Sequence, residues 1–482
     1  MTLVHTMHRE TIDYMSWKDH DSRLDRDPFL KLIWLIGALF LGIFFGPAMA
    51  RGQIAGSPCI PAPTIPITGT RIVNVATETQ LQNAMRNPQA GDTIVLTNGT
   101  YNLTSTLYVN GRDNVTIRGT SGCNDVALVG RGMDNANYGS VPHGIWSNAR
   151  NTVIAHLTIR DIYYHPIIFN AGAQSPHVYS VKLLNAGEQF IKGNPTSPTE
   201  GVDNGIVEYS VLEYTVGPPT IDHGGGIGYT NGLSIHTADN WIIRRNLFKN
   251  FHTPDSSANP WNPAVLMWNH STNTLTERNT FINVDRAIAY GLYDNTGSDH
   301  HGGTIRNNFI YLQPGLMSSA RKANSDAQII VWDSPGTKVF HNTILTNGNV
   351  VKSIEVRFNT TGAETRNNLA DAPIGSRDGG SASQSGNLLT AMPDMFANPS
   401  IGDLHLRSTA TAAIDRAPTL ASVADDIDGN ARPLGAGYDI GADEFVRGAG
   451  DITPPSAPTG LTITPIAASE GVHQIKPMEN EI

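Results

Sequence analysis

Short apolar runs alternate with polar turn residues along this chain, and one such pattern occurs five times between Trp241 and Leu369. Each copy has a cationic residue, then an asparagine, then an apolar residue two places later. The copies are Arg245–Phe248, Arg278–Phe281, Arg306–Phe309, His341–Ile344 and Arg366–Leu369. Repeats at intervals of roughly 25 to 35 residues are typical of solenoids. The spacing therefore predicts coils of short strands that stack on one another.

The asparagine in each copy suits a sharp bend between two strands. Asparagine tolerates left-handed backbone, and its amide can bond to nearby backbone. Stacked coils would place asparagine over asparagine, so each amide could donate to one neighbour and accept from the other. We expect such a ladder, with Ser210 in the same place one coil earlier. The alternative is a set of chance dipeptides in an asparagine-rich chain.

The segment before the repeats predicts a strand, a helix and a second strand. Ile72–Val75 forms the first strand, Thr77–Met85 a short amphipathic helix, and Gly91–Leu96 the second strand. An uncovered coil end exposes unpaired backbone groups. We therefore expect this helix to cover the N-terminal end of a coil that spans residues 71–400.

The residues "GDTIVLTNGTY" at Gly91–Tyr101 precede the coils. Together with the repeats, the pattern from Ile72 to Leu369 resembles the right-handed parallel β-helix proteins of the pectate-lyase-like superfamily. The resemblance implies an all-β fold, a right-handed parallel β-helix with an N-terminal helical cap. Lyases, hydrolases, epimerases and adhesins share this scaffold, so it implies a fold more strongly than a reaction.

The N-terminal residues 1–50 are typical of a secretory signal peptide. An apolar run over Ile33–Phe45 is followed by a small-residue cleavage pattern at Ala48–Ala50. The alternative is an uncleaved membrane anchor. Residues 51–70 form an extended lead-in. Cys59 and Cys123 follow the signal, and in an exported protein they can pair.

The C-terminal residues 401–447 predict a tail that caps the coil. Its strings "DIDGNARP" at Asp426–Pro433 and "DIGADEF" at Asp439–Phe445 are similar to the closing segment of many secreted bacterial β-helix proteins. The acidic string could bind Ca²⁺. The alternative is that Asp and Gly close turns of the tail. Residues 448–482 predict a Pro-rich, disordered linker.

The charge of the chain narrows its partners. The net charge is −10 and no basic run occurs, which argues against nucleic acid. We expect a monomer that is secreted, periplasmic or at the surface of a bacterium, has no membrane contact after signal removal, and has polysaccharide as its partner.

Aligning one strand of each coil predicts a column of outward side chains. The middle residue of each aligned segment is apolar and should face the core, so the third residue should face outward. This column contains Trp146, Asn170, Lys192, His236, Trp268, Tyr290, Trp332 and Arg357.

A contiguous outer patch of aromatic residues usually marks a binding surface. Aromatic rings stack on sugars, so we expect a substrate-binding face built from Trp146, Asn170, Trp268, Tyr290 and Trp332. The alternative is a second core, with the tryptophans covered by the loops 215–232, 252–262 and 294–303.

The catalytic candidates of the column are Lys192, His236 and Arg357. A lyase that acts on an anionic glycan needs a base for the proton α to the carboxylate, and positive charge beside that carboxylate. A hydrolase would need paired carboxylates, and no outward pair forms a motif among Asp222, Asp239, Asp294, Asp333 and Glu355.

The sequence thus favours binding and β-elimination of an anionic polysaccharide. The first alternative function is that of a non-catalytic glycan-binding surface or adhesion protein, and the second is that of a hydrolase or epimerase. No cofactor is required by any motif, and the sequence assigns no metal ligand apart from the acidic tail. His300–His301 with Asp299 could hold a metal, although adjacent histidines in a Gly-rich loop are usually exposed.

Overall fold

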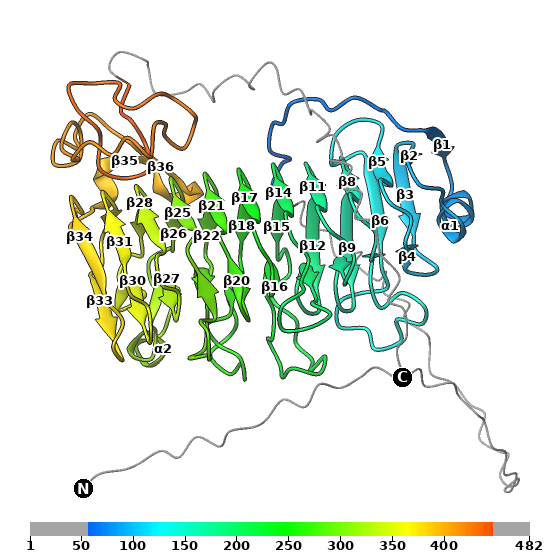
Figure 1. Ribbon diagram of the computed structural model, residues 1–482, viewed down its shortest axis with the longest axis horizontal. Coiled ribbons are helices and arrows are strands. Elements are labelled where there is room, and N and C mark those ends of the chain that lie inside the picture. The colour runs from blue at the N-terminus through cyan, green and yellow to red at the C-terminus, as the bar shows by residue number, and fades with distance from the viewer. Residues whose placement is uncertain (1–55, 447–482) are drawn as a thin grey trace, which may run out of the picture. The chain divides into compact units, whose positions relative to one another are not determined.

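A computed structural model describes residues 56–446. The predicted signal peptide at 1–50 and the linker at 448–482 lie outside the described residues. Most of the described chain winds through three parallel sheets in turn, so that each coil adds one strand to each sheet (Figure 1). The protein is a right-handed parallel β-helix, as the repeats predicted.

Sheet A has 12 strands, sheet B has 10 and sheet C has 10. Sheet A contains β1 (Arg71–Val75), β2 (Asp92–Leu96), β5 (Thr116–Gly119), β8 (Val153–Ala155), β11 (His177–Tyr179), β14 (Ile206–Glu208), β17 (Ile242–Arg244), β21 (Leu275–Glu277), β25 (Thr304–Arg306), β28 (Lys338–Phe340), β31 (Ala363–Arg366) and β34 (Ala382–Ser385). Sheet B contains β3 (Gly99–Asn102), β6 (Val126–Val129), β9 (Thr158–Ile162), β12 (Lys182–Ala186), β15 (Val211–Glu213), β18 (Leu247–Lys249), β22 (Thr280–Ile282), β26 (Phe309–Tyr311), β29 (Thr343–Leu345) and β32 (Leu369–Ala370). Sheet C contains β4 (Leu107–Val109), β7 (Ile145–Ser147), β10 (Ile167–Phe169), β13 (Ile191–Gly193), β16 (Leu233–His236), β19 (Pro263–Trp268), β23 (Arg286–Tyr290), β27 (Ala327–Trp332), β30 (Lys352–Arg357) and β33 (Ile374–Arg377).

The remaining elements lie in the connections and in the tail. They are the helices α1 (Glu78–Arg86) and α2 (Ser319–Ala323), the 3₁₀ turns η1 (Pro393–Met395) and η2 (Pro399–Ile401), the parallel pair β20 (Ser271–Thr272) and β24 (His300–His301), and the antiparallel pair β35 (Phe396–Asn398) and β36 (Asp403–Leu406).

The core follows from the alternation of side chains along each strand. Inward positions of all three sheets are apolar and join one continuous cluster. Where large rings occur on neighbouring coils they stack, as Phe248 and Phe281 do with ring centroids 4.8 Å apart. Each coil therefore buries its apolar face only against its neighbours, which is why the repeats must stack.

The predicted asparagine ladder is present, and it is longer than expected. Each amide donates to the amide oxygen of the next coil over 2.9–3.1 Å, and also to a backbone carbonyl of the preceding coil. Ser210 extends it as predicted, since its backbone N–H donates to the amide oxygen of Asn246. The ladder runs through Asn246, Asn279, Asn308, Asn342, Asn368 and Asn387.

The sequence alignment was wrong by one residue in two copies of the repeat. Asn308 and Asn368 are the ladder residues, where the repeat Arg-Asn had pointed to Asn307 and Asn367. The left-handed residue is also not the ladder asparagine but the one before it, such as Arg245 with φ 55°. Two asparagines in a row hid the register, because either one fits the pattern.

The N-terminal segment covers the first coils. Helix α1 begins after Thr77, whose hydroxyl accepts the N–H of Gln80, and it places Leu81 and Met85 in the main core at the end of the coil (Figure 1). The helical cap is therefore present as predicted.

The lead-in packs on the outer face of sheet A. Its apolar residues Ile60, Ala62 and Ile65 contact an outer cluster around Tyr179. A disulfide joins Cys59 to Cys123, which lies between β5 and β6. The expected cysteine pairing is thus present, and it fastens the lead-in to the coil.

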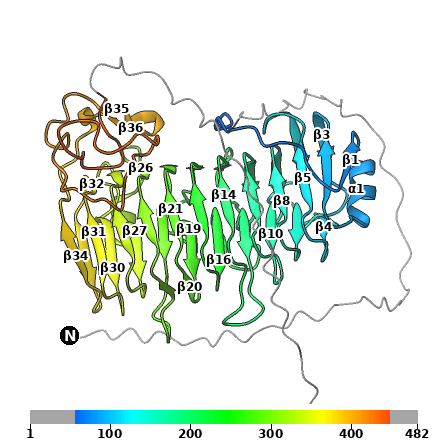
Figure 2. The ribbon, with the colours of Figure 1, turned by 45° about the horizontal axis from the view of Figure 1, so that its top comes forward.

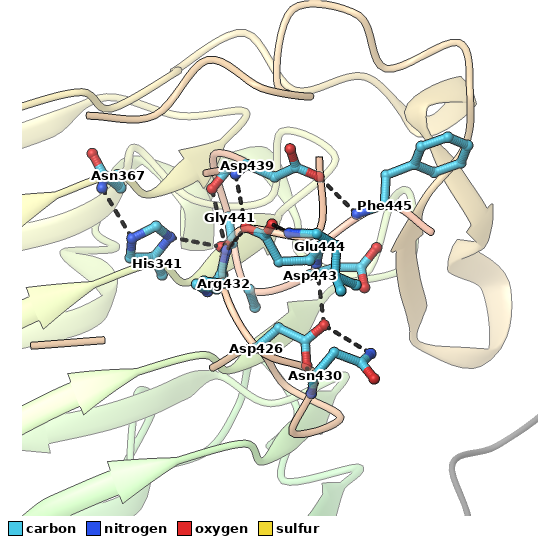
Figure 3. A network of polar contacts seen from close by, with 12 residues as sticks. His341, Asn367, Asp426, Asn430, Arg432, Asp439, Gly441, Asp443, Glu444 and Phe445 are labelled. Carbon is cyan, nitrogen blue, oxygen red and sulfur yellow. Dashed lines mark hydrogen bonds and ion pairs between the residues drawn. The ribbon is translucent and has the colours of Figure 1, made fainter. Parts of the chain in front are cut away.

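The tail lies on a flank of the coil, against the outer face of sheet B (Figure 2). Apolar tail residues such as Phe396, Leu404 and Ile440 pack on outward residues of β22, β26, β29 and β32. The buried guanidinium of Arg432 pairs with Glu444 at 2.6 Å and donates to the carbonyl of Gly441 at 2.9 Å (Figure 3). The two acidic strings thus fold onto each other around one buried arginine.

The Asp-x-Asp-Gly string closes its own turn. One carboxylate oxygen of Asp426 accepts three backbone N–H groups, from Asp428, Gly429 and Asn430, over 2.8–3.0 Å. Nearby, both ring nitrogens of His405 face carboxylates, which raises the pKa of His405 to about 11 against the effect of burial. The ligand atoms of His405, Asp428 and Asp443 lie within 4.8 Å of one another, and a metal ion bound there would have to displace the imidazole proton.

Candidate functional site

The strand register of sheet C divides the predicted outer column into two. Trp146 and Lys192 share one outward row, with Ile168 between them. His236 pairs with Trp268 in a second outward row, two residues further along the strands. Side chains of both rows lie on the outer face of the sheet, because they differ by an even number of residues.

A lysine and a histidine meet where the two rows come together. Lys192 Nζ lies 2.8 Å from His236 Nε2 and 3.3 Å from the hydroxyl of Ser234. On its other side, the His236 ring receives the side-chain amide of Asn269 at Nδ1, at 2.7 Å. Two predicted catalytic residues are therefore in direct contact.

The hydrogen bonds of His236 allow both protonation states of Lys192. If the Asn269 amide N–H donates to Nδ1, the ring proton sits on Nε2 and donates to a neutral amine. If the amide is turned so that its oxygen faces Nδ1, the ring proton sits on Nδ1 and Nε2 accepts from an ammonium. In the second arrangement Nε2 can also accept an N–H from a neutral amine, whose lone pair then stays free to take a proton.

Burial shifts two opposite groups of this face toward neutrality. Loss of hydration lowers the pKa of Lys192 to about 8, with Glu188 opposing that shift. Loss of hydration also raises the pKa of Glu188 to about 7, while Lys192 opposes it. Burial and the neighbouring Lys192 keep the pKa of His236 well below its ordinary value. Groups with pKa values near the working pH are suited to proton transfer.

Aromatic rings flank the Lys192–His236 pair on both sides. Toward the N-terminal coils, half-exposed Trp146 contacts Tyr108, with ring centroids 5.7 Å apart. Toward the C-terminal coils, Trp268 lies 4.5 Å from the His236 ring and 5.8 Å from exposed Tyr293. An open polar pair between two aromatic platforms can receive an extended chain of sugar rings.

Asn170, another residue of the predicted column, bonds to the neighbouring coil. Asn170 accepts an amide N–H from Asn194 at 2.8 Å, across neighbouring coils. This short ladder runs beside the Lys192 row and leaves the two amides half-buried on the same side of the sheet.

The expected outward position of Tyr290 is wrong. Tyr290 pairs with Met267 and Val331 on inward positions, and its side chain is buried in the main core. Its hydroxyl donates to the carbonyl of Thr274 at 3.0 Å. The segment Ile288–Tyr290 was aligned one residue out of register, because the apolar residue Ala289, taken as the inward one, faces outward beside Leu266 and Ile330.

Trp332 and Arg357 lie away from the pair. Trp332 is only 6% exposed, with the guanidinium groups of Arg286, Arg357 and Arg377 over its ring within 5.3 Å of the centroid. Arg357 stands four strands from His236 in sheet C, about 19 Å at the usual strand spacing. For Trp332 the packed alternative is therefore correct, and Arg357 does not join Lys192.

The outward carboxylates of the column also have structural partners. Glu355 is fully buried and accepts from Trp332 Nε1 at 3.0 Å and from Lys352 Nζ at 2.7 Å. Asp333 is buried and accepts backbone N–H groups of Asn295 and Asp299. His300 is buried too, between the hydroxyls of Ser334 and Thr274, and is not the exposed loop residue that was expected.

Sequence reasoning missed Glu188, Asn269 and Tyr293. Glu188 stands in the turn just before β13, with its side chain 15% exposed and 3.5 Å from the ring of His165. Tyr293 is held over Trp268 by a loop whose N–H groups bond to buried Asp299. These residues lie in connections of irregular length, so no repeat pattern could have found them.

The chain matches no protein-family model and no curated protein sequence. Among solved structures it is similar to an alginate lyase from Paenibacillus sp. str. FPU-7, with 16% identity, a TM-score of 0.41, and coverage of 66% of this chain and 95% of that one. It is also similar to the pectate lyase Pel9A, at 12% identity and a TM-score of 0.41 over 78% of this chain and 97% of that one. An iota-carrageenase complexed to iota-carrageenan fragments shares 11% identity at a TM-score of 0.41, over 68% of this chain and 93% of that one. Similarity at this level does not identify a substrate or a reaction, so the chemistry rests on the side chains themselves.

Proposed function

We propose that the protein binds an anionic polysaccharide along the outer face of sheet C and cleaves it by β-elimination. The observation that carries this proposal is the contact of Lys192 Nζ with His236 Nε2 at 2.8 Å, between two aromatic platforms. A lysine with its pKa lowered to about 8 supplies the neutral amine that such a reaction needs.

In the proposed step, neutral Lys192 takes the proton from the carbon α to the uronate carboxylate. The electron pair of that C–H bond becomes the new double bond. The glycosidic oxygen leaves with the electrons of the bond that breaks, and takes a proton from water. Throughout this step His236 Nε2 accepts an N–H from Lys192, first from the amine and then from the ammonium, so the lone pair of the neutral amine is free for the substrate proton.

Glu188 has a separate role in this scheme. Negative charge builds on the substrate carboxylate as the proton leaves, and hydrogen-bond donors stabilise it. Because burial raises its pKa to about 7, Glu188 is partly protonated near neutral pH and can donate such a bond. Buried carboxylic acids that stay neutral are known to donate hydrogen bonds to the negative charge that develops on a substrate.

A second candidate function is glycoside hydrolysis, which one observation favours. Glu188 has a raised pKa, while backbone N–H groups of Gly224 and Gly226 lower the pKa of the neighbouring carboxylate of Asp222. Two carboxyl groups with separated pKa values are the usual acid and base of a hydrolase. In that reaction Glu188 would protonate the leaving oxygen.

The decisive experiment is incubation of the protein with alginate, pectate and a glycosaminoglycan. Elimination produces an unsaturated sugar that absorbs in the ultraviolet, whereas hydrolysis produces reducing ends without that absorbance. We expect the absorbing product from at least one polymer, and its loss in Lys192→Ala. Reducing ends alone would favour the hydrolase. Binding without either product would make the protein a non-catalytic glycan-binding protein.

We further propose that the protein acts outside the cytoplasm. The disulfide between Cys59 and Cys123 supports this location, because such bonds persist in oxidising compartments. Within residues 56–446, no helix is long and apolar enough to cross a membrane.

A further inference from the structure

A pocket lies at the N-terminal end of the sheet C face. It has a volume of about 460 Å³ and is enclosed by the end of α1, the turn that follows it and strand β4. Its lining is mostly polar, with Tyr108 as the exposed ring. The charged side chains in it are both arginines, Arg86 and Arg112.

The two arginines have no anionic partner within residues 56–446. Neither guanidinium makes an ion pair or a side-chain hydrogen bond there, and both side chains are exposed. The nearby carboxylate of Glu78 accepts from Thr104 at 2.7–2.9 Å instead, and Asp113 accepts the backbone N–H of Arg150. The pocket therefore offers two guanidinium groups to an anionic ligand in a chain whose net charge is −10.

The pocket and the proposed reaction site lie along the same row of outward residues. Tyr108, Trp146, Ile168 and Lys192 occupy the same outward row of four adjacent strands. Tyr108 is 41% exposed and touches Trp146, so the row offers an apolar track from the pocket to the lysine. At the usual strand spacing, Tyr108 lies about 14 Å from Lys192 along this row.

Helix geometry explains the position of only one of the arginines. Arg86 lies in the last turn of α1, where a cation interacts favourably with the helix dipole. Arg112 belongs to the turn after β4 and has no such reason to face the pocket. Guanidinium groups bind carboxylates and sulfates through paired N–H groups, and they are preferred for that purpose over ammonium groups.

We propose that this pocket is a distal subsite for the same polysaccharide chain. Arg86 and Arg112 bind a carboxylate or sulfate of a sugar remote from the bond that breaks, and Tyr108 with Trp146 stacks on the sugars between. This inference rests on the proposed function, since it requires the chain to pass Lys192. It gives the enzyme a preference for long anionic chains over short fragments.

The test compares long and short substrates with a variant that removes both charges. In Arg86→Gln/Arg112→Gln we expect KM for the polymer to rise about tenfold relative to KM for a trisaccharide too short to reach the pocket, a loss of about 1.4 kcal/mol. The version with lysine at both positions should recover part of this loss. Arg407→Gln, an exposed arginine of the tail, is the control for loss of a surface positive charge away from the pocket.

A ratio of KM values that does not change, or an equal change in Arg407→Gln, would overturn the subsite. Binding of the polymer to Lys192→Ala, measured by affinity electrophoresis with and without the two arginines, separates the two proposals. The wild-type protein could cleave no polymer while the arginine variant binds the polymer more weakly than the wild type does. That outcome would support the subsite and contradict the elimination reaction. Parallel assays with pectate and with a sulfated glycosaminoglycan distinguish carboxylate from sulfate as the anchored group.

Discussion

At the scale of single residues, the chemistry of this protein depends on what surrounds Lys192. An exposed lysine is protonated at neutral pH and cannot act as a base. On the outer face of sheet C, loss of hydration lowers its pKa, and the neighbouring Glu188 limits that shift. On a solvated strand the same lysine would stay protonated and could not act as a base, so its proposed role depends on its neighbours.

The pH dependence of the reaction should report on this lysine. Because the reaction needs the neutral amine of Lys192 and the protonated carboxyl of Glu188, kcat/KM should rise as pH approaches 8 and fall again at higher pH, where Glu188 has lost its proton. The charge of Glu188 raises the pKa of Lys192, so Glu188→Gln should move this rise to lower pH and retain part of the activity. The measurement is the pH profile of the ultraviolet assay, with Glu364→Gln on sheet A as control. A Glu188→Gln rate that falls through pH 8 would mean that the ammonium form of Lys192 is the active one.

At the scale of elements, the asparagine ladder holds the coils in register. Asn279 donates from Nδ2 to the carbonyl of Ile243 at 2.8 Å and to the amide oxygen of Asn308 at 3.1 Å. Its own amide oxygen accepts both the backbone and the side-chain N–H of Asn246 at 3.0 Å. All of these groups are buried and cannot reach water, so each hydrogen bond satisfies a polar group that would otherwise have no partner.

Removing one ladder residue should therefore be costly. In Asn279→Ala the donors of Asn246 lose their acceptor in a buried place, and we expect the free energy of unfolding to fall by about 2–4 kcal/mol. The matched control is Asn359→Ala, whose only side-chain bond is an exposed one to Asp294, and it should change stability by less than about 0.5 kcal/mol. Equal losses in urea denaturation would show that burial of the ladder is not what matters.

At the scale of the whole described chain, both ends fold back onto outer faces of the coil. The lead-in covers part of sheet A and is fastened by the disulfide, while the tail covers part of sheet B. The face of sheet C that carries Lys192 receives neither segment among these contacts. The two flanking segments thus cover apolar outer faces of sheets A and B, and the proposed polysaccharide face lies on sheet C.

Docking of the tail should depend on its buried arginine. Arg432→Ala leaves the carboxylate of Glu444 buried without its ion pair, a change that typically costs about 3–5 kcal/mol. We expect the tail to become sensitive to limited proteolysis, and the uncovered face of sheet B to bind a hydrophobic dye. Arg416→Ala, at an exposed position of the same tail, should do neither. If the tail of the Arg432 variant stays resistant to proteolysis, the apolar contacts alone are sufficient to hold the tail on sheet B.

The sequence by itself determined the coil. Stacked short strands must repeat their apolar and turn positions in every coil, so the fold is written as a local pattern and can be read without coordinates. The same reasoning located the capping helix, the ladder with Ser210 and the two cysteines. It failed where the pattern was ambiguous, at Asn307–Asn308 and Asn367–Asn368, and where an outward residue is apolar, as at Ala289.

Only the tertiary structure decided which side chains share a site. The sequence predicted Lys192 and His236, but a one-step error along a strand separates an outward residue from a core residue, as Tyr290 shows. Glu188, Asn269 and Tyr293 come from connections whose lengths differ between coils, so no periodic rule brings them together. Their distances, and the burial that moves the pKa of Lys192, arise from packing between coils, which a linear pattern does not contain.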